Sequence, residues 1–399
     1  MANTYKDNPR SLKTLLGCIL IIATIGCDEF DPAPVTFTQA DIVSMGAVQT
    51  LEIRERVLTS LPESAPEVNT QQASLGRLLF WDPILSGNRD VACATCHLPE
   101  FGYTDNQHQS IGVGGTGRGE QRVEGHTGRV PRNSQTVLNT VWNGIDELGN
   151  VDANSAPMFW DNRVQTLEAQ AIEPIRSREE MRGDNFAQNA IDSEISARLN
   201  ANAEYQLLFS EAFGVQTITA TEITQALASF QKTLVANDSP FDRWMRGESD
   251  AMTDRQVSGM QEFVIAGCAD CHNGPLFSDF EPHVLGVHEG ADVLEPDEGD
   301  GTFAFRTPTL RQLAFTAPYF HAGQFSTLGD AIEFYDGPGN STNPNVPTSE
   351  LDEEFLEIPE MDDGRGAIIQ DFLDALNDDT FDQEIPSTVP SGLPVGGFE

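Results

Sequence analysis

Two cysteine motifs constrain this chain more than any other feature of its sequence. Each has the pattern Cys-x-x-Cys-His, one at residues 93–97 and one at residues 268–272. The pattern is typical of covalent c-type haem attachment, because two thiols one helical turn apart can each bond a porphyrin vinyl group. The adjacent histidine is then placed as an axial iron ligand. The sequence therefore predicts two c-type haems, held by Cys93, Cys96, His97, Cys268, Cys271 and His272.

Three other kinds of chemistry use cysteines at such spacings. Four thiols can bind structural zinc, but a histidine after each pair would then be coincidence. A thioredoxin-like redox pair requires a βαβ context, which the surrounding pattern lacks. Disulfides are compatible with an exported chain. Two complete motifs that use every cysteine after residue 27 favour haem over these alternatives.

The N-terminus has the three parts of a secretory signal. Lys6, Arg10 and Lys13 precede an apolar run at residues 15–25, and a small residue then precedes Cys27. This order is typical of a bacterial lipoprotein, in which Cys27 is lipidated and becomes the first mature residue. The alternative is an ordinary cleaved signal followed by an incidental cysteine. We expect a periplasmic protein, which lipidation would tether to a membrane without spanning it.

The composition of the chain argues against some classes of binding partner. The chain carries 62 Asp and Glu against 23 Lys and Arg, a net charge of −39. This argues against binding to nucleic acid or to an anionic membrane surface. After the N-terminal segment there is no apolar run of the roughly 18 residues that a membrane span needs. The length suffices for two ordinary domains.

Helical periodicity dominates the rest of the chain. Apolar residues recur at helical spacing in 223–234 and 368–376, whereas strand alternation is scarce. We expect a mostly α fold, with two cytochrome c-like haem domains packed against each other and long loops rich in Gly and Pro. The predicted boundaries are a signal at 1–26, a tether at 27–45, an N-terminal haem domain at 46–248, a C-terminal haem domain at 249–385 and a flexible tail at 386–399.

Five segments together resemble the bacterial diheme cytochrome c peroxidase family, which includes the MauG-like enzymes. They are LGRLLFWDPILSGNRDVACATCH, PRNSQTVLNTVWN, FWDNRVQTLEAQAIEP, CADCHNGPLFSDF and FRTPTLRQLAFTAPYFHAGQFSTLGDAIEFY, in this order. The resemblance covers roughly residues 70–376. It implies that the haem on His97 handles peroxide and that the haem on His272 takes electrons from a small cytochrome c or cupredoxin. Members often form homodimers, which we extend to this chain as an expectation.

The resemblance also implies the residues of the peroxide site. Gln170 and Glu180 match the pair that the family places over the N-terminal haem, where a carboxylate moves a proton between the peroxide oxygens. Glu179 is the alternative to Glu180. His126 matches a loop histidine that caps this iron in gated peroxidases. The glycine-rich run at residues 112–128 would supply the mobile loop. The glycine spacing in this run resembles a dinucleotide-binding motif, but the strand that precedes such a motif is missing from the sequence pattern.

Further residues are implied between the haems. Trp160 matches a tryptophan that can relay an electron between them. The alternative is a core aromatic residue. Asn133, with the backbone carbonyls of Thr316 and Pro318, matches the ligands of one Ca²⁺, and oxygen-only ligation suits this ion.

The residue at position 335 bears on which of two activities the chain has. Typical peroxidases have Met at this position as the second ligand of the C-terminal haem, whereas MauG-like members have Tyr. We expect a peroxidase that reduces hydrogen peroxide to water. The alternatives are a MauG-like oxidase, which uses peroxide-derived high-valent iron to oxidise a protein or organic substrate, and a non-catalytic diheme electron carrier. Tyr335 could also merely pack.

Overall fold

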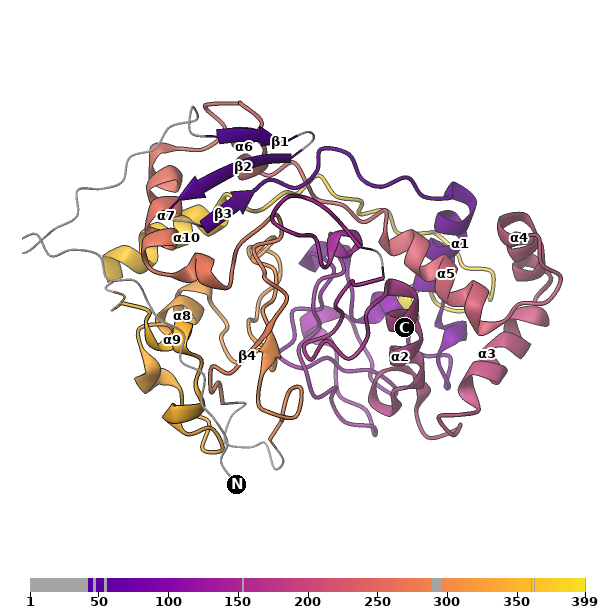
Figure 1. The fold of residues 1–399 in the computed structure, drawn as a ribbon. Helices are drawn as coiled ribbons and strands as arrows, with labels where there is room; N and C mark the ends of the chain where they lie inside the picture. The colour runs from indigo at the N-terminus through magenta and orange to yellow at the C-terminus, as the bar shows by residue number, and fades with distance from the viewer. Residues whose placement is uncertain are drawn as a thin grey trace, which may run out of the picture. The chain divides into compact units, whose positions relative to one another are not determined.

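The computed structural model describes residues 42–45, 48–53, 56–152, 154–288, 296–359, 361 and 363–398. These residues belong to one compact unit, residues 37–399. Helices account for most of the regular structure, which confirms the prediction of a mostly α chain (Figure 1). The α-helices are α1 Thr70–Trp81, α2 Leu167–Arg176, α3 Ile191–Asn200, α4 Ala203–Phe213, α5 Ala220–Gln231, α6 Pro240–Met245, α7 Asp254–Ile265, α8 Leu328–Glu333, α9 Glu353–Leu356 and α10 Asp363–Asp374.

A small antiparallel sheet was not expected from the sequence. Its strands β1 Ile42–Met45, β2 Val48–Ile53 and β3 Arg56–Thr59 are hydrogen-bonded in that order. Leu51 and Leu58 pair across the last two strands and are fully buried against α6, α7 and α10. The end of the expected tether, residues 42–45, is therefore a strand. A second sheet has only β4 Pro282–His283 and β5 Phe305–Arg306.

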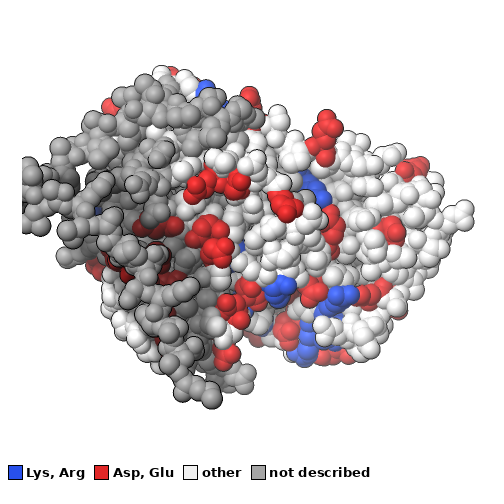
Figure 2. All heavy atoms as spheres, viewed as in Figure 1, with Lys and Arg blue, Asp and Glu red and all other residues white. Residues whose placement is uncertain are grey.

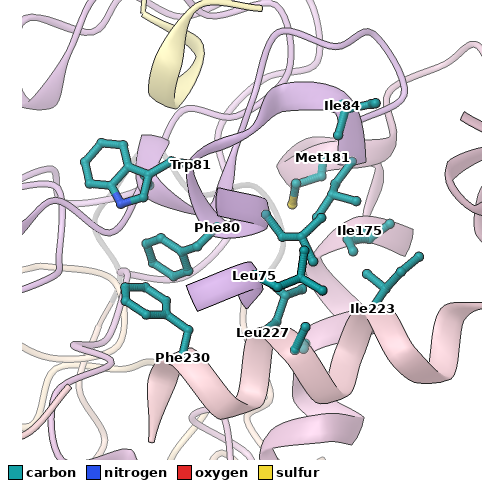
Figure 3. Packing of buried hydrophobic residues seen from close by; sticks show 14 of the residues in the cluster. Leu75, Phe80, Trp81, Ile84, Ile175, Met181, Ile223, Leu227 and Phe230 are labelled. Carbon is teal, nitrogen blue, oxygen red and sulfur yellow. The ribbon is translucent and has the colours of Figure 1, made fainter. Parts of the chain in front are cut away.

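The first hydrophobic cluster forms where α1 crosses α5. Leu75 and Phe80 of α1 point toward Leu227 and Phe230 of α5, with α2 beside them (Figure 3). Gly76 lies at the crossing, where a Cβ atom would stand 1.9 Å from the Ala226 carbonyl oxygen. This close approach requires glycine. The crossing fixes the end of α1, from which the chain continues into the first cysteine motif.

The second cluster repeats this arrangement with α7 and α10. A Cβ atom at Gly259 of α7 would lie 2.1 Å from the Ile368 carbonyl oxygen of α10. Next to this crossing the rings of Phe263 and Phe372 meet edge to face, with their centroids 5.3 Å apart. α7 ends at Ile265, three residues before the second motif begins. Each motif thus follows a helix that packs closely against a second helix at a glycine.

The C-terminal segment corrects one prediction. Residues 386–398 pack on the first cluster instead of forming the expected flexible tail. Val389 is buried, the Ser391 hydroxyl donates to Asp82 at 2.6 Å, and the Thr95 hydroxyl donates to the Gly396 carbonyl at 2.8 Å. The Gly and Pro residues indicate irregular backbone correctly, but the contacts that order it come from residues about 300 positions earlier.

The predicted signal at residues 1–26 and the lipidation site Cys27 lie outside the described residues, so both stay predictions. Among the helices that the structure describes, none combines the length and the apolar composition needed to cross a bilayer.

Candidate haem cavity and active site

One large cavity connects both cysteine motifs. Its volume is about 1450 Å³, and its lining includes both cysteines and the histidine of each motif. A site for one small molecule typically has roughly 300–1,000 Å³. The cavity therefore has room for more than one such group.

The first motif presents its histidine to this cavity. Cys93–Thr95 forms a single 3₁₀ turn, which brings both thiols to the same side. The His97 Nδ1 atom lies 2.9 Å from the Tyr103 carbonyl oxygen, which orients the ring and leaves Nε2 for a metal. Burial lowers the pKa of His97 and raises the pKa of the Cys93 thiol to about 12. Both shifts favour the uncharged form of the group.

The second motif has the same geometry. Cys268–Asp270 forms the turn, and the His272 Nδ1 atom lies 2.9 Å from the Phe277 carbonyl oxygen. Burial again lowers the pKa of this histidine. The four motif cysteines form no disulfide. These residues fit two c-type haems.

Glu180 lies on an unusual turn at the edge of the cavity. Arg178–Arg182 forms one π-helical turn, closed by the Arg182 amide donating to the Ser177 carbonyl at 2.8 Å. Such turns often occur at functional sites. Glu180 is half-buried and lines the cavity. Burial raises the pKa of Glu180, and the charge of nearby Arg163 opposes this effect.

The structure brings Gln170 to the same cavity. It lies on α2, whose N-terminus is capped by the Thr166 hydroxyl. Glu179 also lines the cavity, but its carboxylate is paired with Arg178 at 3.1 Å. Glu180 has no such ion pair among the described residues, which favours it over Glu179 as the proton-transfer group.

His126 lies outside the cavity lining in this structure, and its role as a distal ligand stays a prediction. Its side chain is 60% exposed, and its Nε2 atom lies 3.8 Å from Asp184. It is absent from the residues that line the cavity. The reason is local, because its ring packs against the backbone at Gly114 and the surrounding loop is held by internal hydrogen bonds.

Trp160 joins segments that follow the two motifs. Its indole Nε1 donates to the Asn133 carbonyl at 3.0 Å, and its own carbonyl accepts from the Arg306 amide at 2.7 Å. Its ring meets that of His321 edge to face at 6.5 Å, and the Asn133 amide donates to the His321 carbonyl at 2.6 Å. Trp160 is buried and lines the cavity, as a relay between two haems would.

Tyr335 lies near the second motif. It lines the cavity and packs with Phe320, Phe334 and Phe355. Burial raises the pKa of its phenol, and the neighbouring sulfur groups of the second motif act in the same direction. The position suits an iron ligand on the side of the second haem.

The comparisons with known proteins fit this geometry. The family model for di-haem cytochrome c peroxidase matches residues 70–250. The methylamine utilization protein MauG of Methylorubrum extorquens is 34% identical in an alignment of 286 positions that covers 69% of this chain and 72% of that protein. The chain belongs to the di-haem cytochrome c peroxidase family. Cytochrome c551 peroxidase of Nitrosomonas europaea is also 34% identical, over 66% of this chain and 72% of its own.

Solved structures of the di-haem family have the same fold. A MauG-like protein associated with microbial copper homeostasis matches with a TM-score of 0.64 at 25% identity, over 80% of this chain and 95% of that one. The diheme peroxidase BthA from Burkholderia thailandensis matches with a TM-score of 0.62 at 20% identity, over 82% and 91%. As a member of this family the chain is a peroxidase-type oxidoreductase with two c-type haems.

The sequence analysis missed two cavity residues of this family member. His283 lies between Asp279, at 2.9 Å from Nε2, and Asp352, which contacts Nδ1. Its contact with Asp279, and next its contact with the Cys271 sulfur, raise the pKa of His283 to about 11. Arg306 is buried, and burial lowers its pKa to about 10. The four-residue spacing of Asp279 and His283 was the only local signal for this cluster.

The expected Ca²⁺ ligands all belong to the cavity lining. Asn133, Thr316 and Pro318 all line the cavity, and the Asn133 side-chain amide donates to the Gln107 carbonyl at 2.9 Å. The calcium site stays a prediction.

Proposed function

We propose that this chain reduces hydrogen peroxide to water in the periplasm, with electrons from a small cytochrome c or cupredoxin. The observation that carries the proposal is that Glu180 and Gln170 line the same cavity as His97. When bound, the two haems supply an open iron position for peroxide and the exchange of two electrons. We propose two cytochrome c-like domains, one around each haem, with the predicted bounds 46–248 and 249–385. Within the first range, β2, β3 and α6 pack in the second hydrophobic cluster.

The residues of the chain supply the proton chemistry. The Glu180 carboxylate accepts the proton from the inner peroxide oxygen and returns it to the outer one, first as base and then as acid. Its enclosed position keeps bulk water from competing for that proton. Gln170 donates a hydrogen bond to charge that develops on the leaving oxygen. Two electrons and two further protons complete the conversion to two waters.

Trp160 provides the route between the haems in this proposal, because it is buried and hydrogen-bonded to segments of both halves. Tyr335 serves as the second ligand of the haem on His272. A Ca²⁺ held by Asn133, Thr316 and Pro318 would fix the segments on which Trp160 depends. We also propose a homodimer, as an extension from the family.

A MauG-like oxidase is the second candidate, and two observations favour it. Tyr335 lies near the cysteines of the second motif. A phenolate ligand stabilises ferric iron, so a haem with this ligand would be a poor acceptor of electrons from a high-potential donor. His126 lies away from the cavity, so nothing in the described loop caps the first haem. The chain would then use peroxide to oxidise a protein or organic substrate.

Steady-state peroxide consumption with a reduced donor separates the candidates. Rapid turnover with a small cytochrome c or cupredoxin supports the peroxidase. Rapid reaction with peroxide but negligible turnover with these donors supports the MauG-like oxidase. Reaction with peroxide in neither redox state would leave an electron carrier.

Glu180→Gln tests the proton-transfer role directly. We expect the rate of reaction with peroxide to fall by about 10²- to 10⁴-fold, the usual contribution of a general base. Haem content should not change, because Glu180 attaches neither haem. Glu179→Gln is the matched control, since it removes the adjacent carboxylate, and it should keep most of the activity. Equal rates for Glu180→Gln and the wild type would exclude the assigned role.

A further inference from the structure

The turn that carries Glu180 is held from two sides by segments distant in sequence. The Gly87 amide donates to the Met181 carbonyl at 2.7 Å. From the other side, the Val113 amide donates to the Glu179 carbonyl at 3.1 Å. These two hydrogen bonds flank the one residue whose side chain is assigned to proton transfer.

On the side of Gly112 and Val113, the two backbones lie too close together for residue 112 to carry any side chain. A Cβ atom at Gly112 would lie 2.1 Å from the Glu179 carbonyl oxygen, 2.5 Å from the Glu180 carbonyl oxygen and 2.9 Å from the Glu180 Cα atom. All three atoms are backbone, so rotation of a side chain cannot relieve the clash. The backbone of Glu180 rests directly on that of Gly112.

The glycine-rich loop that contains Gly112 is held by hydrogen bonds from its own side chains. Arg122 is 4% exposed, and its guanidinium donates to the Ile111, Gly112 and Gly117 carbonyls at 2.6, 2.9 and 3.1 Å. The Thr127 hydroxyl donates to the Val113 carbonyl at 2.6 Å. The loop that the sequence suggested as a mobile carrier of His126 is therefore tied together by its own side chains.

We propose that Gly112, braced by Arg122, is a positioning residue that sets the location of the Glu180 carboxyl group in the cavity. The inference rests on the proposed role of Glu180. A carboxyl group that transfers a proton must lie within hydrogen-bond reach of both peroxide oxygens in turn. A glycine whose backbone touches the Glu180 backbone fixes this distance more directly than any side-chain contact.

Gly112→Ala is the test, measured in the haem-loaded protein. We expect the rate of reaction with peroxide to fall by about tenfold to a hundredfold, because a displacement of about 1 Å can cost about 10²-fold. The pH profile of this rate should shift, since Glu180 would move to different surroundings, while the haem content stays at two per chain. Gly339→Ala is the matched control, because a Cβ atom there meets nothing within 4 Å.

A double variant distinguishes positioning from a general structural effect. In a Glu180→Gln background, adding Gly112→Ala should cause no further loss, since both changes act on one group. A full additional loss would show that Gly112 acts elsewhere and would overturn the proposal. A Gly112→Ala single variant with wild-type rate and pH profile would overturn it as well.

Two further outcomes are distinguishable. If Gly112→Ala fails to fold, Arg122→Gln removes the brace without a backbone clash, and it should lower the peroxide rate and shift its pH profile in the same direction. Unchanged kinetics in Arg122→Gln would then refute the proposal. If Glu180→Gln itself reacts with peroxide at the wild-type rate, the proposed function of Glu180 fails first, whatever Gly112→Ala does.

Discussion

Glu180 is a carboxylic acid whose ionised form is disfavoured by its surroundings. Burial raises its pKa above the ordinary value of 4.5, and Arg163 offsets only part of this effect. A base acts in its ionised form, which becomes populated only as the pH rises through the raised pKa. An exposed glutamate would reach that form at lower pH.

The pH dependence of the peroxide reaction follows from this shift. We expect the rate to rise with pH through an apparent pKa above 4.5, and the rise to be lost in Glu180→Gln. Stopped-flow measurements of the fully loaded protein across acidic and neutral pH check this. A midpoint at or below the ordinary glutamate value would contradict the assignment, because burial could then not govern the base.

Tyr335 gives a second test at the scale of one residue. Tyr335→Met should raise the reduction potential of the haem on His272, because a thioether favours ferrous iron and a phenolate favours ferric iron. Spectroelectrochemical titration measures the shift, with the haem on His97 as internal reference. Tyr319→Phe is the control, since Tyr319 also lines the cavity but its hydroxyl donates to the Leu313 carbonyl at 2.8 Å. If both variants keep the wild-type potential, Tyr335 is not a ligand.

At the scale of elements, the C-terminal segment packs on the first hydrophobic cluster and contacts the first cysteine motif. Val389 and Phe398 pack on the first cluster, while the Gly396 carbonyl accepts from Thr95 inside the first cysteine motif. Each large buried apolar side chain contributes roughly 1.5–3 kcal/mol. The segment therefore contributes to stability beyond what its composition suggests.

Deletion of residues 386–399 should lower the unfolding free energy by at least about 2 kcal/mol, through exposure of the surface that Val389 now covers. It should also change the absorbance spectrum of the haem on His97 and leave that of the haem on His272 unchanged. Thermal unfolding and spectra of the two haems check both parts. An unaltered melting temperature would mean that the segment contributes little.

The limits of sequence analysis also appear at this scale. The cysteine motifs are contiguous, and their spacing alone predicted the haem attachment residues. Glu180, by contrast, was found only through family resemblance, because it is one of 62 acidic residues and its turn is formed by contacts from residues 87 and 113. The position of His126 outside the cavity lining could not be predicted either, because Arg122 holds its loop through carbonyl contacts that no local pattern reveals.

At the scale of the whole molecule, charge is the dominant feature. Figure 2 shows Asp and Glu spread over the visible face, whereas Lys and Arg gather mainly toward its lower edge. The net charge is −39, so like charges repel across the folded surface. Since exposed charges interact through water, the repulsion depends on ionic strength.

The melting temperature should therefore rise with added NaCl. The screening length falls from about 30 Å at 0.01 M to about 8 Å at 0.15 M, which weakens repulsion across much of the surface. Calorimetry at several NaCl concentrations measures the change, and a neutral osmolyte of equal osmolarity is the control. A melting temperature that falls over this range would show that exposed ion pairs outweigh the repulsion.

Each end of the described chain packs in the hydrophobic core around the more distant cysteine motif. The early strands β2 and β3 bury Leu51 and Leu58 in the core of the later haem site, whereas residues 389–398 complete the core of the earlier one. The first core cannot close on a nascent chain until residues 389–398 have been synthesised, whereas the second core needs no residue after 376. We therefore expect the first cysteine motif to stay accessible until the chain is complete, which gives the machinery that attaches haem time to act before this core forms.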